Sequence, residues 1–372
     1  MTGLYIHIPF CASRCIYCGF YSTTLAHEQD RYVSALCREM EMRKDELQGS
    51  LSTVYIGGGT PSLLSAENLQ RIFLYINKVY APDWDSMEVT MECNPDDVTK
   101  EFCMGLRLTP INRVSMGAQT FSDSRLKFIH RRHNSSEVFK AMKLLREHGI
   151  GNVSIDLMFG FPNETLSDWT SDVDTAISLR PEHISAYSLQ YEEGTPLYRM
   201  LSEGKVKEID DELYRKMYAT LCEKLSEAGY EHYEISNFAL PGRRSRHNSS
   251  YWHNVTYIGL GASAHSYSGH SRSWNVSNLE KYISSIENGV LPAQSEDIDG
   301  QTHYDDMVMT ALRTKEGISL DDMPEKYRRY IMATADKYIK AGEMKCDGHW
   351  LSLTIDGIFV SDMIMSDLMM PD

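Results

Sequence analysis

Residues 5–18 read YIHIPFCASRCIYC, an apolar run that leads directly into three closely spaced cysteines. The run from Leu4 to Ile8 has the β-branched composition of a buried strand, and Pro9 prevents the chain from continuing as a helix. Cys11, Cys15 and Cys18 therefore follow a strand on a loop, with three and then two residues between them. Soft sulfur ligands at this spacing can converge on one corner of an iron–sulfur cluster.

The number of nearby thiolates decides between the kinds of metal site. Three thiolates leave one coordination position open, which favours a cluster with an external ligand. A closed structural zinc site would need a fourth Cys or His nearby, and no second Cys-x-x-Cys follows. Three core cysteines on one helical face are a further alternative that the spacing allows, although the preceding strand disfavours it. The other five cysteines are scattered along the chain.

Before residue 205, short apolar runs alternate with longer segments of helical spacing. This alternation predicts an α/β fold in which a parallel sheet carries helices on its outside. Amphipathic helices are expected over 28–48 and 66–80, and shorter ones after residues 99, 122, 135 and 165. The six expected strands are Leu4–Ile8, Thr53–Ile56, Met87–Glu92, Arg113–Gly117, Asn152–Met158 and His183–Leu189.

The Cys-x3-Cys-x2-Cys loop, preceded by residues 5–10, is similar to that of the radical S-adenosylmethionine (SAM) superfamily. The resembled branch contains oxygen-independent coproporphyrinogen III oxidase and the HemW-type haem chaperones, and the likeness extends over essentially the whole chain. It implies a partial (β/α)6 radical-SAM barrel with a small α/β C-terminal domain. It also implies a [4Fe-4S] cluster on Cys11, Cys15 and Cys18 whose open iron binds SAM, the source of the radical chemistry.

Further SAM contacts are expected where the predicted strands end, because ligands of such barrels gather at that face. Glycines at 57–59 allow a close approach of the backbone, although alone they would indicate only a tight turn. Each polar residue at a strand end is, taken singly, better explained as ordinary surface. Their joint match to the resembled family implies SAM contacts from Tyr5, Gly58, Gly59, Thr60, Glu92, Gln119, Arg131 and Asp156.

A basic island at 243–253 stands out in an acidic chain. By composition alone, an exposed basic loop is the simpler interpretation. However, residues 247–252 read HNSSYW, which is similar to the His-Asn-x-x-Tyr-Trp signature of the HemW-type chaperones. The resemblance implies haem binding, with His247 as the candidate axial ligand and His253, Tyr251 and His265 as alternatives.

Two departures from the oxidase favour the chaperone branch. Phe20 stands where the oxidase pattern carries a further cysteine, and the longer N-terminal extension of the oxidase has no counterpart. The expected function is a haem chaperone that delivers haem to an unidentified acceptor protein. The alternatives are an oxygen-independent coproporphyrinogen III oxidase of porphyrin biosynthesis and a structural zinc protein.

The order of the expected helices and strands along the chain predicts three structural parts. We expect a cofactor-binding barrel over 1–235, an irregular connecting segment over 236–300 with the haem motif, and the C-terminal domain over 301–372. In that last part, helical spacing over 325–341 precedes a hairpin signal around Asp347–Gly348. The Gly-x-Gly-x-x-Ala pattern at 259–264 lacks the strand–helix context of a dinucleotide site and is interpreted as a close-packed turn at the barrel edge.

Composition narrows the partners. The 372 residues carry 37 Lys and Arg against 52 Asp and Glu, a net charge of −15, so nucleic acid is an unfavourable partner. No apolar run is long enough to cross a bilayer, although peripheral docking is allowed. The sparse cysteines and the absence of a signal-peptide pattern predict a reducing cytoplasm.

Overall fold

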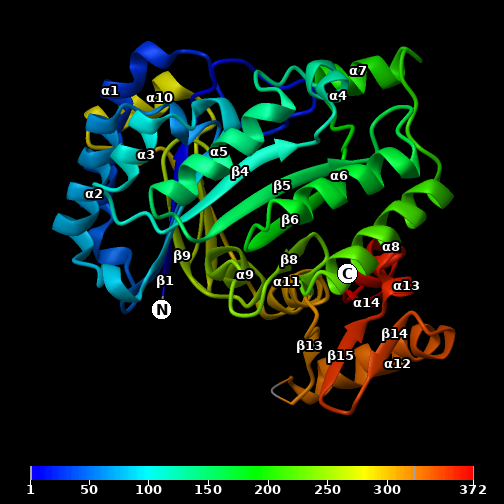
Figure 1. The fold of residues 1–372 in the computed structure, drawn as a ribbon. Coiled ribbons are helices and arrows are strands. Elements are labelled where there is room, and N and C mark those ends of the chain that lie inside the picture. The colour runs from blue at the N-terminus through cyan, green and yellow to red at the C-terminus, as the bar shows by residue number, and fades with distance from the viewer. Residues whose placement is uncertain (1, 322, 372) are drawn as a thin grey trace.

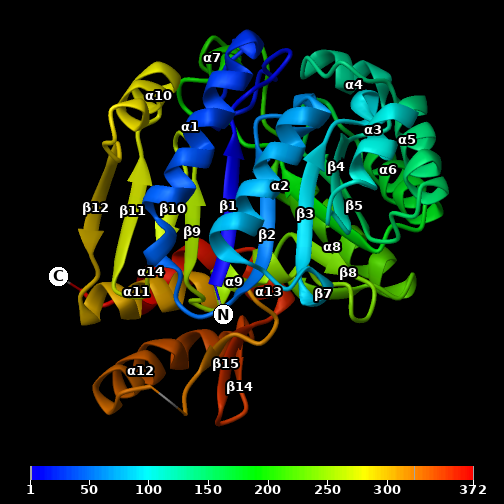
Figure 2. The same cartoon turned by 90° about the vertical axis from the view of Figure 1, so that its left-hand side faces the viewer.

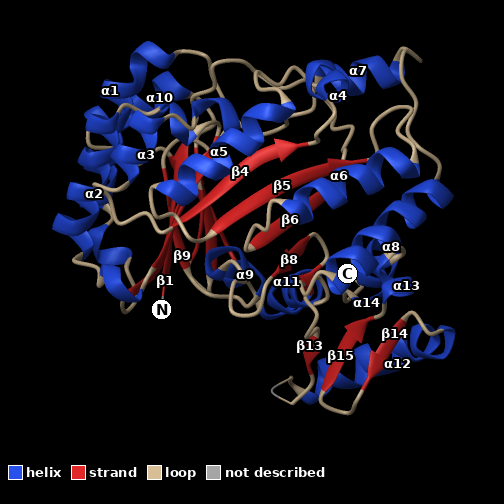
Figure 3. Ribbon diagram, in the orientation of Figure 1, coloured by secondary structure: helices blue, strands red, loops and turns tan. Residues whose placement is uncertain are grey.

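The computed structural model describes residues 2–321 and 323–371. The six expected strands are present and pair in parallel in chain order (Figure 1). They are β1 (Thr2–Ile8), β2 (Leu51–Gly58), β3 (Glu88–Cys93), β4 (Arg113–Gln119), β5 (Val153–Phe159) and β6 (His183–Ser188). Figure 3 shows the helices outside these strands, so the predicted (β/α)6 barrel is confirmed.

The covering helices follow from local sequence. α2 places Leu69, Ile72 and Ile76 against the core, and the side chain of Ser65 caps its first turn. The first helix is shorter than expected, since its last part forms a 3-10 turn at Lys44–Glu46. The helices are α1 (Gln29–Met42), α2 (Ala66–Tyr80), α3 (Lys100–Leu106), α4 (Asp123–Phe128), α5 (Ser135–Glu147), α6 (Leu166–Ser178), α7 (Pro196–Ser202) and α8 (Asp211–Glu227).

The segment 236–300, which we expected to be irregular, is ordered, so that expectation is wrong. Its strands are only three to five residues long and rich in Ser, Asn and Arg, so no apolar period reveals them. They are stabilised by pairing with existing sheet edges. The elements from residue 231 are β7 (Glu231–Glu234), β8 (Asn237–Ala239), α9 (Arg246–Trp252), β9 (Tyr257–Leu260), β10 (His265–Tyr267), β11 (Ser271–Asn275), α10 (Leu279–Glu287) and β12 (Ala293–Asp297).

These strands extend the sheet on both sides of the barrel. The order is β12-β11-β10-β9-β1-β2-β3-β4-β5-β6-β8-β7, so β1 pairs with β2 on one edge and with β9 on the other. In Figure 2, β1 points upward near the middle of this sheet, with β9 to β12 beside it. The cysteine loop therefore leaves a strand that is held on both edges.

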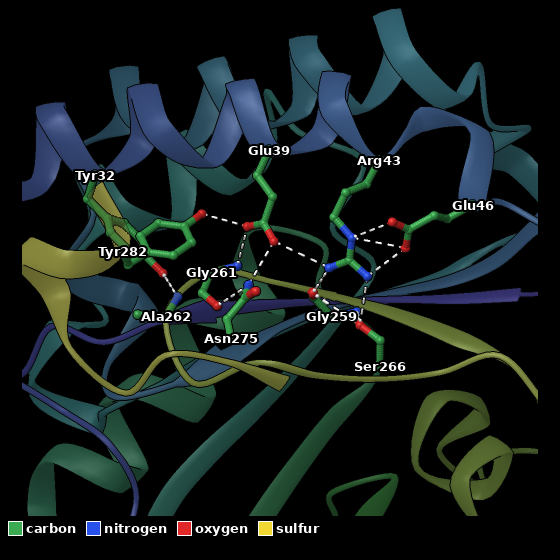
Figure 4. Close-up of polar contacts among 10 residues, drawn as sticks. All are labelled: Tyr32, Glu39, Arg43, Glu46, Gly259, Gly261, Ala262, Ser266, Asn275 and Tyr282. Carbon is green, nitrogen blue, oxygen red and sulfur yellow. Dashed lines mark hydrogen bonds and ion pairs between the residues drawn. The ribbon is translucent and has the colours of Figure 1, made fainter. Parts of the chain in front are cut away.

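A buried polar network joins α1 to the added strands (Figure 4). The carboxylate of Glu39, fully buried, accepts hydrogen bonds from Gly261 N–H at 2.8 Å, Asn275 Nδ2 at 2.7 Å and the Tyr282 hydroxyl at 2.6 Å. It also pairs with Arg43, whose guanidinium donates to the carbonyl oxygen of Gly259. A Cβ on Gly259 would meet the backbone oxygen of His265 at 1.9 Å, so the expected close packing at this turn is present.

The C-terminal part has its own core and a small three-stranded sheet, as predicted. The hairpin around Asp347–Gly348 forms as expected from β14 and β15. None of the helices in the described part of the chain is long and apolar enough to cross a membrane. The elements are α11 (Gly300–Ala311), β13 (Ile318–Ser319), α12 (Glu325–Ala341), β14 (Met344–Cys346), β15 (Trp350–Leu353), α13 (Ile355–Ile358) and α14 (Ser361–Leu368).

Candidate cofactor site

The three cysteines of the first loop follow the carboxyl end of β1. All three thiols are partly exposed, whereas Cys37, Cys93, Cys103 and Cys222 are buried. The thiols lie close enough to influence one another, because burial together with the neighbouring Cys15 and Cys11 raises the pKa of the Cys18 thiol. The three clustered thiols are therefore accessible, and Cys346 in the C-terminal sheet is the other partly exposed thiol among the described residues.

Two polar side chains from other loops reach this cysteine loop. The hydroxyl of Thr60 donates to Cys11 Sγ at 3.6 Å, and Arg131 Nη1 donates to Cys15 Sγ at 3.8 Å. A donor beside a sulfur stabilises its thiolate form, which is the form that binds iron. The structure thus brings two of the predicted SAM-site residues to the predicted cluster ligands.

The residues of the glycine loop are held against the first strand. Gly59 N–H donates to the carbonyl of Ile8, and Thr60 N–H donates to that of Phe10, both at 2.8 Å. A Cβ on Gly59 would come within 2.9 Å of those backbone atoms, so no larger residue fits there without displacing the chain. The glycine loop fixes the base of the cysteine loop.

Glu92 lies near the end of β3, half-buried beside the glycine loop. Its carboxylate accepts hydrogen bonds from the Tyr55 hydroxyl at 2.7 Å and from Gly58 N–H at 3.0 Å. Gly57 permits this approach, since a Cβ there would lie 3.0 Å from the carboxylate. Burial raises the pKa of Glu92 to about 7, which makes it a carboxyl that changes charge near neutral pH.

Gln119 and Arg131 converge at the end of β4. The register of β4 against β5 shifts between Gly117 and Gln119, and Gln119 has a φ of 66°, a left-handed conformation unusual for this residue type. Arg131 donates to the carbonyl of Gly117 at 2.5 Å and to Asn94 Oδ1 at 2.6 Å. Strained backbone of this kind clusters at functional sites.

The remaining two predicted contacts lie deeper in the barrel. The hydroxyl of Tyr5 is 3.0 Å from His7 Nδ1, and its ring stacks on Tyr55 with centroids 6.2 Å apart. Asp156 accepts from the Ser115 hydroxyl at 3.2 Å. Its pKa is raised by burial. The structure therefore places Tyr5 in the same interior layer as Tyr55, and Asp156 across the barrel on β5.

His247 lies at the opposite end of the barrel from the cysteine loop. It is on α9, buried against the amino ends of β1 and β2, and both ring nitrogens are occupied, by Thr53 Oγ1 and by the Tyr251 hydroxyl, each at 2.8 Å. Burial and the nearby charge of Arg113 lower its pKa to about 3. Coordination of iron by His247 would require Tyr251 to move, so this assignment stays a hypothesis.

Sequence reasoning missed several polar partners of the site. Tyr55, Asn94 and Gly117 each contact a predicted residue but were not proposed. A signal was available for two of them, because Tyr55 shares a strand face with Gly57 and Asn94 lies two residues beyond Glu92. No such pattern indicated that Gly117 leaves room for Gln119 and Arg131, whose atoms a Cβ would meet at 2.8 and 2.9 Å.

The residues present fit an iron–sulfur cluster with an open position. Three neighbouring thiols lie on one loop beside a hydroxyl and a guanidinium, and Arg131 Nε is buried without a hydrogen-bond partner. Within residues 2–321 and 323–371, no three Cys, His, Asp or Glu side chains already converge as metal ligands. The thiols would therefore turn toward a common point when they bind the cluster.

Comparisons with known proteins agree with this geometry. Residues 5–176 match the family described as the Radical SAM superfamily. A relative from Bacillus subtilis (strain 168), "Heme chaperone HemW", is 39% identical over 334 residues, which cover 89% of this chain and 88% of the relative. A HemW from Mycobacterium tuberculosis (strain ATCC 25618 / H37Rv) is 33% identical over 375 residues, with 99% and 94% covered.

The fold also matches a solved structure. The Escherichia coli coproporphyrinogen III oxidase HemN, described as a radical SAM enzyme, gives a TM-score of 0.84 at 21% identity and covers 99% of this chain and 90% of its own. Barrel, cysteine loop and family match together define the class, a radical SAM barrel protein. Within that class, the chain belongs to the HemW family.

Proposed function

We propose that this chain is a haem carrier that binds a [4Fe-4S] cluster, SAM and haem, and delivers haem to an acceptor protein in the cytoplasm. The observation that supports this most directly is its identity, over nearly the whole chain, to relatives named heme chaperones. The HemN likeness supports the shared fold only. The chemistry of the site does not indicate which protein receives the haem.

Cys11, Cys15 and Cys18 would hold the cluster, with Thr60 and Arg131 favouring the thiolate form of two of them. A bound cluster and SAM together supply one-electron chemistry. The residues that we propose for SAM are Tyr5, Gly58, Gly59, Thr60, Glu92, Gln119, Arg131 and Asp156, which line the carboxyl ends and interior of β1 to β5.

These residues have distinct tasks in the proposal. Arg131 would hold a carboxylate, since its guanidinium is a cationic group that reaches the cysteine loop from another part of the barrel. Glu92 would accept from an ammonium or from hydroxyl groups. Because backbone N–H of Gly58 already donates to Glu92, this carboxylate is held in place before any ligand arrives.

The oxidase of porphyrin biosynthesis is the alternative that must be excluded experimentally. The position at which the oxidase pattern carries another cysteine is occupied by Phe20, which is 72% exposed beside the cluster loop. Phe20 cannot serve as a ligand to iron. Its ring instead gives an apolar surface at the entrance of the site.

An anaerobic assay separates the two functions. Protein with reconstituted cluster is incubated with SAM, a strong reductant and coproporphyrinogen III, and ferric haem is titrated into the same preparation. The carrier predicts saturable haem binding near one per chain and no protoporphyrinogen IX. Formation of protoporphyrinogen IX would establish the oxidase and overturn the carrier proposal.

A further inference from the structure

A haem ligand must offer a neutral imidazole nitrogen that is not already bonded within the protein. The chain has 13 histidines, which differ in burial and in the hydrogen bonds of their rings. His7, His183 and His247 are buried with both ring nitrogens engaged. His27 and His349 are exposed but lie beside carboxylates. Eight histidines remain, and five of them are exposed, so the surroundings of each must decide between them: His130, His253, His265, His270 and His303.

His265, at the start of β10, combines the required properties. Its side chain is exposed, and no hydrogen bond to its ring is formed within the described residues. Its imidazole lies against the indole of Trp274, with ring centroids 6.0 Å apart and planes at 26°. Burial and the charge of Arg272 lower its pKa, which favours the neutral form of the ring. No other exposed histidine in the described part of the chain has an aromatic ring alongside it.

The strands around His265 present one continuous face. His265 pairs with Trp274, and Tyr267 pairs with Arg272, in the antiparallel register of β10 and β11. Because side chains alternate along a strand, all four project from the same face. Ser266 projects from the other face, where it accepts from Arg43. The face thus holds an imidazole, an indole, a phenol and a guanidinium, groups suited to a flat macrocycle with anionic substituents.

The positive charge on this face, that of Arg272, is already paired with carboxylates of the protein. Arg272 forms ion pairs with Glu296 at 3.0 Å and Asp306 at 3.3 Å, and all three side chains are partly exposed. Carboxylates on a ligand would compete for the same guanidinium. The pairs therefore hold Arg272 in position at the edge of the face.

The face also lies near the cofactor end of the barrel. His265 is close enough to His7 to influence its titration, and His7 precedes the cysteine loop by four residues. His247, by contrast, lies at the far end beside Thr53. The two candidate ligands thus define two separate places on the molecule.

We propose that His265, stacked on Trp274 and flanked by Tyr267 and Arg272, is the axial ligand of haem, and that His247 is a structural residue of the barrel core. This inference rests on the proposed haem-carrier function. It locates the haem on the inner face of β10 and β11, beside the cofactor loop.

The test uses the full-length chain and ferric haem. His265→Ala should weaken haem binding at least about tenfold and shift the Soret band, and added imidazole should restore the wild-type spectrum. Trp274→Ala should weaken binding while leaving the histidine-ligated spectrum. His270→Ala removes an exposed histidine from the turn between β10 and β11 and serves as the matched control, with no expected change.

The outcomes separate this inference from the proposed function. An unchanged spectrum and affinity in His265→Ala would overturn the inference, as would loss of the ligand spectrum in a folded His247→Ala protein. If the wild-type chain showed no saturable haem binding, the proposed carrier function itself would fail. Retention of the wild-type spectrum in His247→Ala, with its loss in His265→Ala, supports the assignment.

Discussion

The hydroxyl of Tyr55 donates a 2.7 Å hydrogen bond to the carboxylate of Glu92 in the barrel interior, where Tyr55 is buried and Glu92 is half-buried. This bond stabilises the ionised form of Glu92, yet burial outweighs it and raises the pKa to about 7. The charge of a predicted SAM contact is therefore set mainly by burial, and it is opposed by a tyrosine that the sequence did not single out.

Glu92→Gln should change the pH dependence of stability. The folded protein binds a proton on Glu92 more tightly than the unfolded chain does, so this stabilisation is present below the ordinary carboxyl pKa and is lost as pH rises through about 7. Relative to Glu92→Gln, the wild-type apoprotein should lose up to about 3 kcal/mol between about pH 5 and about pH 8. Denaturant unfolding at both pH values measures this difference.

Glu101→Gln provides a control, because the pKa of Glu101 is shifted in the opposite direction to that of Glu92. The exposed Glu101 carboxyl has a lowered pKa, because its own backbone N–H and the hydroxyl of Thr99 donate to it. Its loss should leave the pH dependence between these two values unaltered. Parallel curves for wild type and Glu92→Gln would show that burial does not govern the titration of Glu92.

Gly59→Ala should displace the cysteine loop. The new Cβ would lie 2.8 to 2.9 Å from backbone atoms of residues 8–10, which cannot give way as a side chain can. We expect a loss of about 1–3 kcal/mol in the free energy of unfolding, together with less iron bound after reconstitution. Gly151→Ala is the matched control, since nothing lies within 4 Å of a Cβ at that position. Equal iron content in the two variants would contradict this account.

Replacement of any one cluster cysteine should abolish the cluster. Cys11→Ala, Cys15→Ala and Cys18→Ala are each expected to reduce bound iron from about four atoms per chain to nearly none. Cys346→Ala, at a partly exposed thiol in the C-terminal sheet, should retain the full amount. Iron and sulfide analysis of anaerobically reconstituted protein measures this, and full iron in a Cys15→Ala protein would exclude Cys15 as a ligand.

Glu39→Ala should destabilise the join between α1 and the added strands. Its removal leaves Arg43 with one fewer counter-charge and leaves Asn275 and Tyr282 without their acceptor. Breaking such a buried pair typically costs about 3–5 kcal/mol. Lys78→Ala removes an exposed ion pair between α1 and α2 and should have little effect on urea unfolding. Similar midpoints for the two variants would show that the network carries no stability.

The sequence predicted those elements whose apolar spacing is strong. The helix at 66–80 was placed with both ends correct, because Ser65 caps it and a regular stripe faces the core. The strand–loop position of the three cysteines was likewise predictable from Pro9 and the preceding run. The strands within 236–300 could not be predicted from the sequence. Strands such as Ser271–Asn275 are stabilised by hydrogen bonds to neighbouring strands rather than by their own apolar residues.

The candidate site was predictable as a set of residues but not as a set of contacts. Glu92 and Arg131 were found from their positions after strands, but their partners Tyr55 and Asn94 depend on which side chains the barrel brings together. The basic composition of 243–253 favoured an exposed loop, whereas the structure buries His247 among tyrosines. Burial of a short polar segment is a tertiary property that local sequence does not encode.

The pairing of β1 with β9 has a consequence for the order in which the molecule is made. β1 leaves the ribosome before the other described strands, but its second neighbour follows about 250 residues later, and Glu39 meets Gly261, Asn275 and Tyr282 only then. Throughout most of synthesis, one edge of the strand that bears the cysteine loop is unpaired. A cysteine loop supported on both edges of its strand therefore exists only after the chain has been made beyond Tyr282.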